Sequence, residues 1–163
     1  MIRHKAKLAE SYCVQAKYKL ARPYFEQALV GSEKVNGPDS QETGDILYKY
    51  GGLHYDEGEF GEAEIKFKKA MKIFALKPDA DKEDIAQKTI ALGDVLDMQG
   101  KSEEAQTVYM QLMPTFEASP DKASLVRFLK QYQKHLLMQN KKEEAGKIAA
   151  RIKDIKSGGG EKK

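Results

Sequence analysis

The side chains best suited to chemistry in this sequence are three histidines and one cysteine. The histidines are His4, His54 and His135, which fall in three different predicted helices, and the cysteine is Cys13. Nucleophilic catalysis needs a nucleophile, a base and an orienting group within hydrogen-bond reach of one another. The sequence assembles no such set. We therefore expect His54 to pack half-buried between helices and the other two histidines to be solvated.

Motifs for phosphate, zinc and calcium are absent as well. The sequence holds no GxxxxGK[ST], HExxH or GxSxG motif and no EF-hand loop. Residues 79–84, DADKED, lack the glycine and the final glutamate of a calcium loop, so we expect them to cap a helix. Cys13 stands alone, which excludes an intramolecular disulfide. The sequence predicts a protein that is not an enzyme and holds no metal or other cofactor.

The composition is typical of one folded domain. The chain has 163 residues, of which 33% are charged and 40% are hydrophobic. It contains no run of about 18 apolar residues, and its basic start lacks the apolar core of a secretory signal. We expect an intracellular, cytoplasmic protein without a membrane span.

Charge changes sign along the chain. Residues 1–35 hold seven Lys/Arg and three Asp/Glu, residues 36–121 hold nine and eighteen, and residues 122–163 hold twelve and four. This distribution favours a protein partner of alternating charge or head-to-tail association of two copies, and the alternative is a solvated surface without a partner. The acidic centre would repel phosphate, so we expect no nucleic-acid partner.

The elements that position these side chains are predicted by a repeat of 42 residues. Ala21, Ala63 and Ala105 are 42 residues apart, and Ala145 follows after 40. Three more columns share the 42-residue period: Phe25, Phe67 and Tyr109; Ala9, Gly51 and Gly93; Ala28, Ala70 and Leu112. Apolar residues at helical spacing on both sides of a turn predict a pair of helices, which buries its apolar stripe only by packing on neighbouring pairs.

We therefore expect an all-α fold, an α-solenoid of four helix–turn–helix repeats with about eight helices. Residues 1–156 are predicted to form one domain, with a flexible tail at 157–163. The predicted repeats are residues 2–35, 42–76, 83–117 and 121–156.

Turn residues set the predicted helix ends. Gly58 and Gly100 are expected to close first helices, and Asn140 takes that place in the fourth repeat because asparagine tolerates a left-handed conformation. Pro23 is expected in the first turn of its helix, where its missing N–H costs nothing. Pro114 is expected to end a helix together with residues 118–121, ASPD.

The columns resemble the tetratricopeptide repeat, whose first helix carries a large residue followed by Leu-Gly and then Tyr. Here the corresponding residues are Leu8-Ala9 with Tyr12, Tyr50-Gly51 with His54, and Leu92-Gly93 with Leu96. The period of 42 residues is similar to that of the kinesin light chain subclass, although the paired asparagines of that subclass are missing. The resemblance implies a right-handed superhelix that binds proteins in its concave groove, which the first helices line.

The predicted groove residues are those first-helix residues that lie outside the packing columns. In the first two repeats they are Arg3, Ala6, Glu10, Cys13, Asp45, Tyr48, Gly52 and Tyr55. In the last two repeats they are Gln87, Ile90, Asp94, Asp97, Arg127, Lys130, Lys134 and Leu137.

Tyr48 and Tyr55, which flank Gly52 in the sequence, are predicted to form a surface on which a partner peptide packs. The alternative is that both tyrosines are partly buried against the next repeat. Carboxylates such as Asp94 and Asp97 would pair with basic residues of the partner, and lysines such as Lys130 would pair with acidic ones. We expect an adaptor or scaffold that binds a peptide or helix. The alternatives are a self-associating segment of a larger repeat scaffold and a peptide-sensing regulatory domain.

Overall fold

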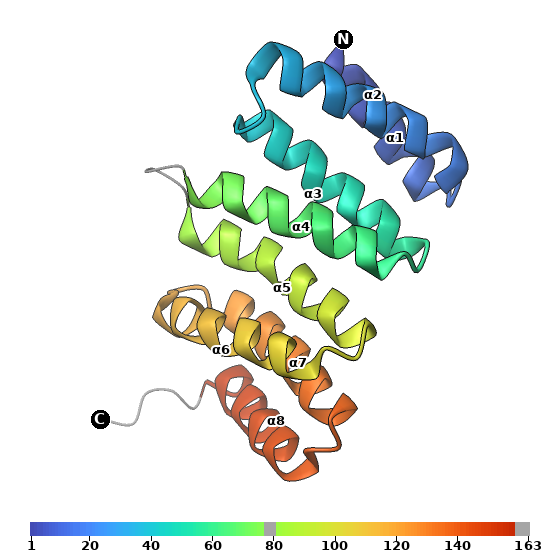
Figure 1. Ribbon diagram of the computed structural model, residues 1–163. Coiled ribbons are helices and arrows are strands. Elements are labelled where there is room, and N and C mark those ends of the chain that lie inside the picture. Colours follow the sequence, from blue (N-terminus) through green and yellow to red (C-terminus); the bar gives the residue numbers. More distant parts are fainter. Residues whose placement is uncertain (77–80, 159–163) are drawn as a thin grey trace. The chain divides into compact units, whose positions relative to one another are not determined.

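A computed structural model describes residues 1–76 and 81–158 of the chain, and within them all regular structure is α-helical (Figure 1). The helices are α1 (Ile2–Val14), α2 (Tyr18–Asn36), α3 (Gln41–Asp56), α4 (Phe60–Ala75), α5 (Lys82–Met98), α6 (Ser102–Ala118), α7 (Lys122–Met138) and α8 (Lys142–Lys156). The prediction of an all-α fold is confirmed, and the observed helix bounds agree with the predicted repeats to within two residues.

Consecutive helices pack as four hairpins, α1–α2, α3–α4, α5–α6 and α7–α8. The contacts divide the chain into an N-terminal unit, Met1–Ala80, and a C-terminal unit, Asp81–Lys163. In the N-terminal unit α2 packs on α3, and in the C-terminal unit α7 packs on both α5 and α6. The prediction that residues 1–156 act as one domain stays a prediction.

The alanine and aromatic columns form the core of the hairpins. Ala21, Ala63, Ala105 and Ala145 are at most 1% exposed. Phe25, Phe67 and Tyr109 are also buried, whereas Ala149, which takes the aromatic position in the fourth hairpin, is half-buried. The 42-residue columns are therefore packing positions, as their spacing predicted.

Close approach between helices explains the glycine column. A Cβ added to Gly51 would lie 2.8 Å from the buried Phe67 ring, and one added to Gly93 would lie 2.9 Å from Tyr109. Each aromatic ring of the second helix thus rests on the bare backbone of the first helix. Gly52 differs, because a Cβ there would meet no atom within 4 Å.

The four hairpin turns share one backbone geometry. Gly58, Gly100 and Asn140 adopt the left-handed conformation, with φ of 77°, 73° and 59°. In each turn the following residue donates a backbone hydrogen bond to the carbonyl five positions back, as Glu59 does to His54 at 2.8 Å. The first turn reaches the same geometry with Ala16 at φ 54°, which costs a residue with a Cβ about 1–2 kcal/mol.

Two proline predictions are wrong. Pro23 is the sixth residue of α2 and not part of its first turn, and α6 continues through Pro114. The helix α6 does end at Ala118, the first residue of the ASPD run that was predicted to stop it. Both prolines are exposed, and the residues four positions earlier, Lys19 and Met110, are exposed as well. Water can therefore hydrate the carbonyls that lose their helical partner, which lowers the cost of an interior proline.

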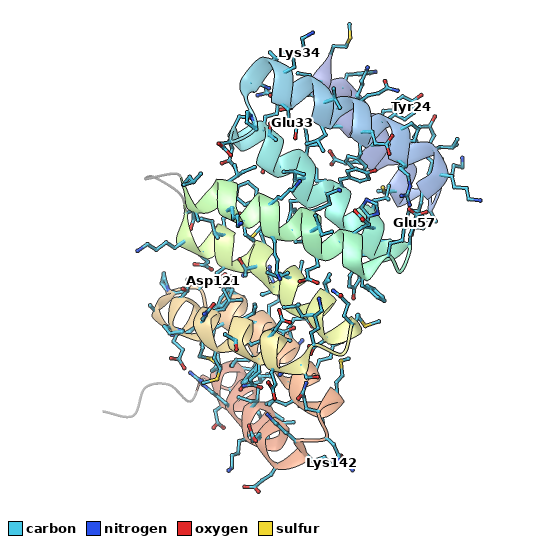
Figure 2. All side chains as sticks on the ribbon, in the orientation of Figure 1. Tyr24, Glu33, Lys34, Glu57, Asp121 and Lys142 are labelled. Atoms are coloured by element: carbon cyan, nitrogen blue, oxygen red, sulfur yellow. The ribbon has the colours of Figure 1, made fainter. Side chains whose placement is uncertain are left out.

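Side-chain caps fix the starts of three first helices. Ser40 accepts a hydrogen bond from the Thr43 backbone N–H at the start of α3, and Asp81 accepts bonds from Glu83 and Asp84 at the start of α5. Asp121, labelled in Figure 2, does the same at the start of α7. The predicted capping role of the acidic run is thus confirmed for Asp81, while residues 79 and 80 lie outside the described part of the chain.

The two neighbouring glycines of α3 should respond to substitution in opposite directions. Gly51→Ala should lower the free energy of unfolding by about 1 kcal/mol or more, because the new methyl group clashes with the buried Phe67 ring. Gly52→Ala should raise it by about 1 kcal/mol, because alanine favours the helix and open space surrounds the site. Urea denaturation measures both, and destabilisation by Gly52→Ala would contradict the assignment of open space.

Candidate functional site

A groove runs between α1 and α3, the first helices of the two hairpins in the N-terminal unit. Its volume is about 520 Å³. The lining residues are Arg3, Ala6, Lys7 and Glu10 of α1, Asn36 at the end of α2, Ser40 at the N-cap of α3, and Gln41, Glu42, Asp45, Ile46 and Lys49 of α3. Most are polar or charged side chains outside the packing columns, so they are available to contact another molecule.

Two ion pairs connect the walls of this groove. The Arg3 Nε donates to Glu42 Oε1 at 3.2 Å, and the Lys49 Nζ donates to Glu10 Oε1 at 2.8 Å. Both pairs are exposed, with the Arg3 side chain 85% accessible, so each contributes little to stability. Lys7 lies between them in sequence and makes no ion pair within residues 1–76 and 81–158.

Some of the predicted groove residues line the groove. Glu10 of the predicted site lies there, together with Arg3, Ala6 and Asp45. Sequence reasoning missed Lys7 and Lys49. Lys7 was identifiable, because it follows Arg3 by four residues and precedes Glu10 by three, which places all three on one helix face.

The other predicted residues of α1 and α3 are not among those that line the groove. The ring centroids of Tyr48 and Phe67 are 5.2 Å apart, and those of Tyr55 and Phe60 are 5.6 Å apart. Both tyrosines therefore pack on α4, and both are half-buried. Burial and the nearby carboxylates of Asp56, Glu10 and Glu57 raise the pKa of the Cys13 thiol to about 11. Cys13 is therefore almost entirely protonated near neutral pH and unsuited to act as a nucleophile.

The predicted groove residues of α5 do not present a free acidic surface. Ile90 is 7% exposed and Asp97 is 8% exposed. Asp94 accepts a hydrogen bond from the Tyr109 hydroxyl at 3.1 Å and lies 3.9 Å from the Lys134 Nζ. Burial raises the pKa of the Asp94 carboxyl in spite of Lys134 and Tyr109, which act in the other direction. On α7, Arg127 and Lys130 are exposed.

His135 is buried, and the expectation that it is solvated is wrong. Its Nδ1 lies 2.7 Å from Asp97 Oδ1, and its Nε2 lies 2.8 Å from Gln106 Oε1. The Gln106 amide in turn donates to the Tyr132 hydroxyl at 2.8 Å. This network joins α5, α6 and α7. His135 is 38 residues from Asp97 and 29 residues from Gln106 in the sequence, so helical periodicity gives no indication of either contact.

His54 is buried more completely than predicted, with 2% of its surface exposed. Its Nδ1 lies 2.6 Å from Glu59 Oε2, while Nε2 has no hydrogen-bond partner among the described residues. The Arg22 guanidinium donates to both Glu59 and Glu57, the latter labelled in Figure 2. These contacts tie α2 to α3 and to the turn before α4. Among the described residues, no group of three or more His, Cys, Asp or Glu side chains is arranged to hold a metal ion.

The carboxylate of Glu59 should make stability depend on pH. Hydrogen bonds from His54 and Arg22 lower its pKa below the usual 4.5. The contribution of the Glu59 carboxylate to the free energy of unfolding is therefore present above about pH 4.5 and is lost as pH falls through its lowered pKa. We expect Glu59→Gln to remove this part of the acid sensitivity, as measured by urea midpoints between about pH 3 and about pH 6.

The matched control for this measurement is Glu33→Gln, which changes an exposed glutamate of α2 labelled in Figure 2. Glu33 has no ion pair within the described residues, so its substitution should leave the pH profile as it is. Equal acid sensitivity in Glu59→Gln and in the unchanged protein would overturn the role assigned to Glu59.

None of the helices in the described residues is both long enough and apolar enough to cross a bilayer.

Comparison with solved structures agrees with the architecture. A kinesin light chain of Podosopora anserina with nearly identical TPR-like repeats superposes with a TM-score of 0.85 over 99% of this chain and 77% of its own, at 13% identity. BtubC (BKLC) from P. vanneervenii gives 0.85 over 99% of this chain and 66% of its own, at 17% identity. At these identities the similarity concerns the fold alone.

Sequence comparison identifies the family. A clustered mitochondria protein homolog of Debaryomyces hansenii is 39% identical over 69 residues, which are 42% of this chain and 5% of that protein. The chain therefore spans only a small part of this relative's length. The tetratricopeptide repeat family model matches residues 2–76 and 45–118, which together cover more than half of the sequence. The chain belongs to the tetratricopeptide repeat family.

Proposed function

We propose that this chain is a non-enzymatic protein-interaction module that binds a short peptide segment of a partner in the groove between α1 and α3. The observation that carries the proposal is the groove itself, a hollow of about 520 Å³ lined mostly by polar and charged side chains, with the core residues Ala6 and Ile46 also in its lining. Tetratricopeptide repeats generally mediate protein interactions, which agrees with this assignment.

The size and chemistry of the groove favour a peptide over a metabolite. The groove lies within the roughly 300–1,000 Å³ typical of ligand sites, and charged residues make up more than half of its lining, with much of its surface formed by their aliphatic stems. Exposed Arg, Lys, Asp and Glu side chains supply hydrogen bonds and ion pairs to polar chains without demanding a buried ring or acyl group. A few residues of an extended peptide fit this description.

Gly52 supports a partner that extends beyond the groove along α3. Neither a positive φ nor a close neighbour requires glycine here, yet glycine costs about 1 kcal/mol relative to alanine inside a helix. We propose that the partner backbone approaches α3 closely at Gly52, beside Tyr48 and Tyr55. On α7, Arg127, Lys130 and Lys134 are proposed as a separate basic contact surface for the same class of partner.

Peptide binding can be tested without knowledge of the natural partner. Twelve-residue peptides selected from a random library against the unchanged chain would be labelled and titrated by fluorescence anisotropy. We expect Lys49→Glu to weaken binding about tenfold or more, because it removes a cation and breaks the bond to Glu10 in the groove wall.

The matched control is Lys69→Glu, the same charge change at an exposed position of α4 outside the groove lining. Binding should be unaffected by this variant. If no library peptide is enriched, or if the two variants bind the selected peptides equally well, the groove is not the binding site.

Self-association is a second candidate, and exposed apolar residues of the first hairpin favour it. Tyr12 of α1 and Tyr24 of α2 are stacked with their centroids 5.7 Å apart and are only half-buried, and Leu20 is 52% exposed. Such a surface suits contact with a further hairpin, in another copy or in a longer scaffold. Light scattering should then show a mass that rises with concentration and falls on Tyr24→Ser, and a constant monomer mass would contradict this candidate.

A further inference from the structure

We propose that the α1–α3 groove selects peptide segments of mixed charge, in which an acidic side chain pairs with Lys7 and a nearby basic side chain lies toward Asp45. This inference rests on the proposed function and specifies the chemistry of the partner. It follows from the order of charges along the two walls and from Lys7, a cation of the groove that forms no ion pair with any residue that the structure describes.

The charges of the two walls occur in complementary order. Along α1 they are Arg3, Lys7 and Glu10, and along α3 they are Glu42, Asp45 and Lys49. Successive charges on each helix are three or four residues apart, so each set occupies one face at intervals of about one turn, or roughly 5.4 Å. The first and last positions are joined across the groove by Arg3–Glu42 and Lys49–Glu10.

The middle position of the groove holds Lys7 and Asp45. Lys7 makes no ion pair within the described residues, although both it and Asp45 line the groove. Asp45 accepts a hydrogen bond from the Gln41 amide at 3.4 Å, and a carboxylate has further acceptor positions for a second donor. A ligand carboxylate can pair with Lys7, and the negative charge of Asp45 attracts a ligand cation nearby.

The balance of charge in the walls disfavours ligands of a single sign. Three cations and three carboxylates line the groove. A run of acidic residues would gain at Lys7 but meet the carboxylates of Glu10, Glu42 and Asp45 on neighbouring turns, within the screening length of about 8 Å. A run of basic residues would meet the three cations in the same way. A segment that alternates in sign avoids both penalties.

The two ion pairs that join the walls, Arg3–Glu42 and Lys49–Glu10, do not block such a ligand. The side chains of Lys49 and Glu10 are 45% and 39% exposed, and Arg3 is more exposed still, so these ion pairs are weak in water. A ligand can exchange either pair for one of its own at little net cost. The middle of the groove thus favours a ligand whose charges alternate in sign, while the two ion-paired ends tolerate different ligand side chains.

The test uses a random library of twelve-residue peptides displayed against the unchanged chain and against the double charge reversal Lys7→Glu with Asp45→Lys. We expect peptides enriched by the unchanged chain to carry an acidic and a basic residue within about four positions of each other. Lys7→Glu alone should weaken them about tenfold or more. The double reversal should enrich peptides with the order of the two charges inverted.

Controls separate this inference from the proposed function. Circular dichroism verifies that each variant stays helical, and Asp45→Asn replaces Asp45→Lys if the lysine unfolds α3. If all enriched peptides carry one sign of charge and still depend on Lys7, mixed-charge selection is wrong and groove binding stands. If enriched peptides bind every groove variant equally, or none is enriched, both ideas fail.

Discussion

The structure depends on the close contact between a residue without a side chain on the first helix of a hairpin and an aromatic ring on the second. In the N-terminal unit the Phe67 ring lies against Gly51, and in the C-terminal unit the Tyr109 ring lies against Gly93. This contact brings the two helices together, and the alanines of the second helix complete the seam. The residues left over on the first helices of the N-terminal unit then form the walls of the groove.

The fold was predictable from sequence because it is a local and repeated property. The 42-residue columns predicted the hairpins, and Gly58, Gly100 and Asn140 predicted their turns through the left-handed conformation that each adopts. The first turn and the prolines escaped prediction. Ala16 carries no sign of the conformation that it adopts, and the cost of an interior proline depends on whether water reaches the carbonyl one turn earlier.

The candidate site was less predictable, because it depends on which side chains meet across different helices. Helical spacing placed Arg3 and Glu10 on one face of α1, but it contained no indication that Glu42 and Lys49 would pair with them. The same limit explains His135. A histidine that lies among lysines on an amphipathic helix is predicted to be solvated. His135 is buried instead, because it contacts Asp97, which is 38 residues away in the sequence. Residue types identify candidates for burial or exposure, whereas the register between hairpins decides their partners.

The two buried histidines have a consequence for how the chain comes apart. His54 with Glu59 and Arg22 spans hairpins one and two, and His135 with Asp97 and Gln106 spans hairpins three and four. In a linear array, cooperativity is set by the coupling between neighbours relative to the stability of each repeat. Both ring nitrogens of the buried His135 have partners in hairpin three, so separating hairpins three and four breaks both contacts, which adds to this coupling. The C-terminal unit should therefore melt as a pair of hairpins, and neither hairpin three nor hairpin four should survive alone as a folding intermediate.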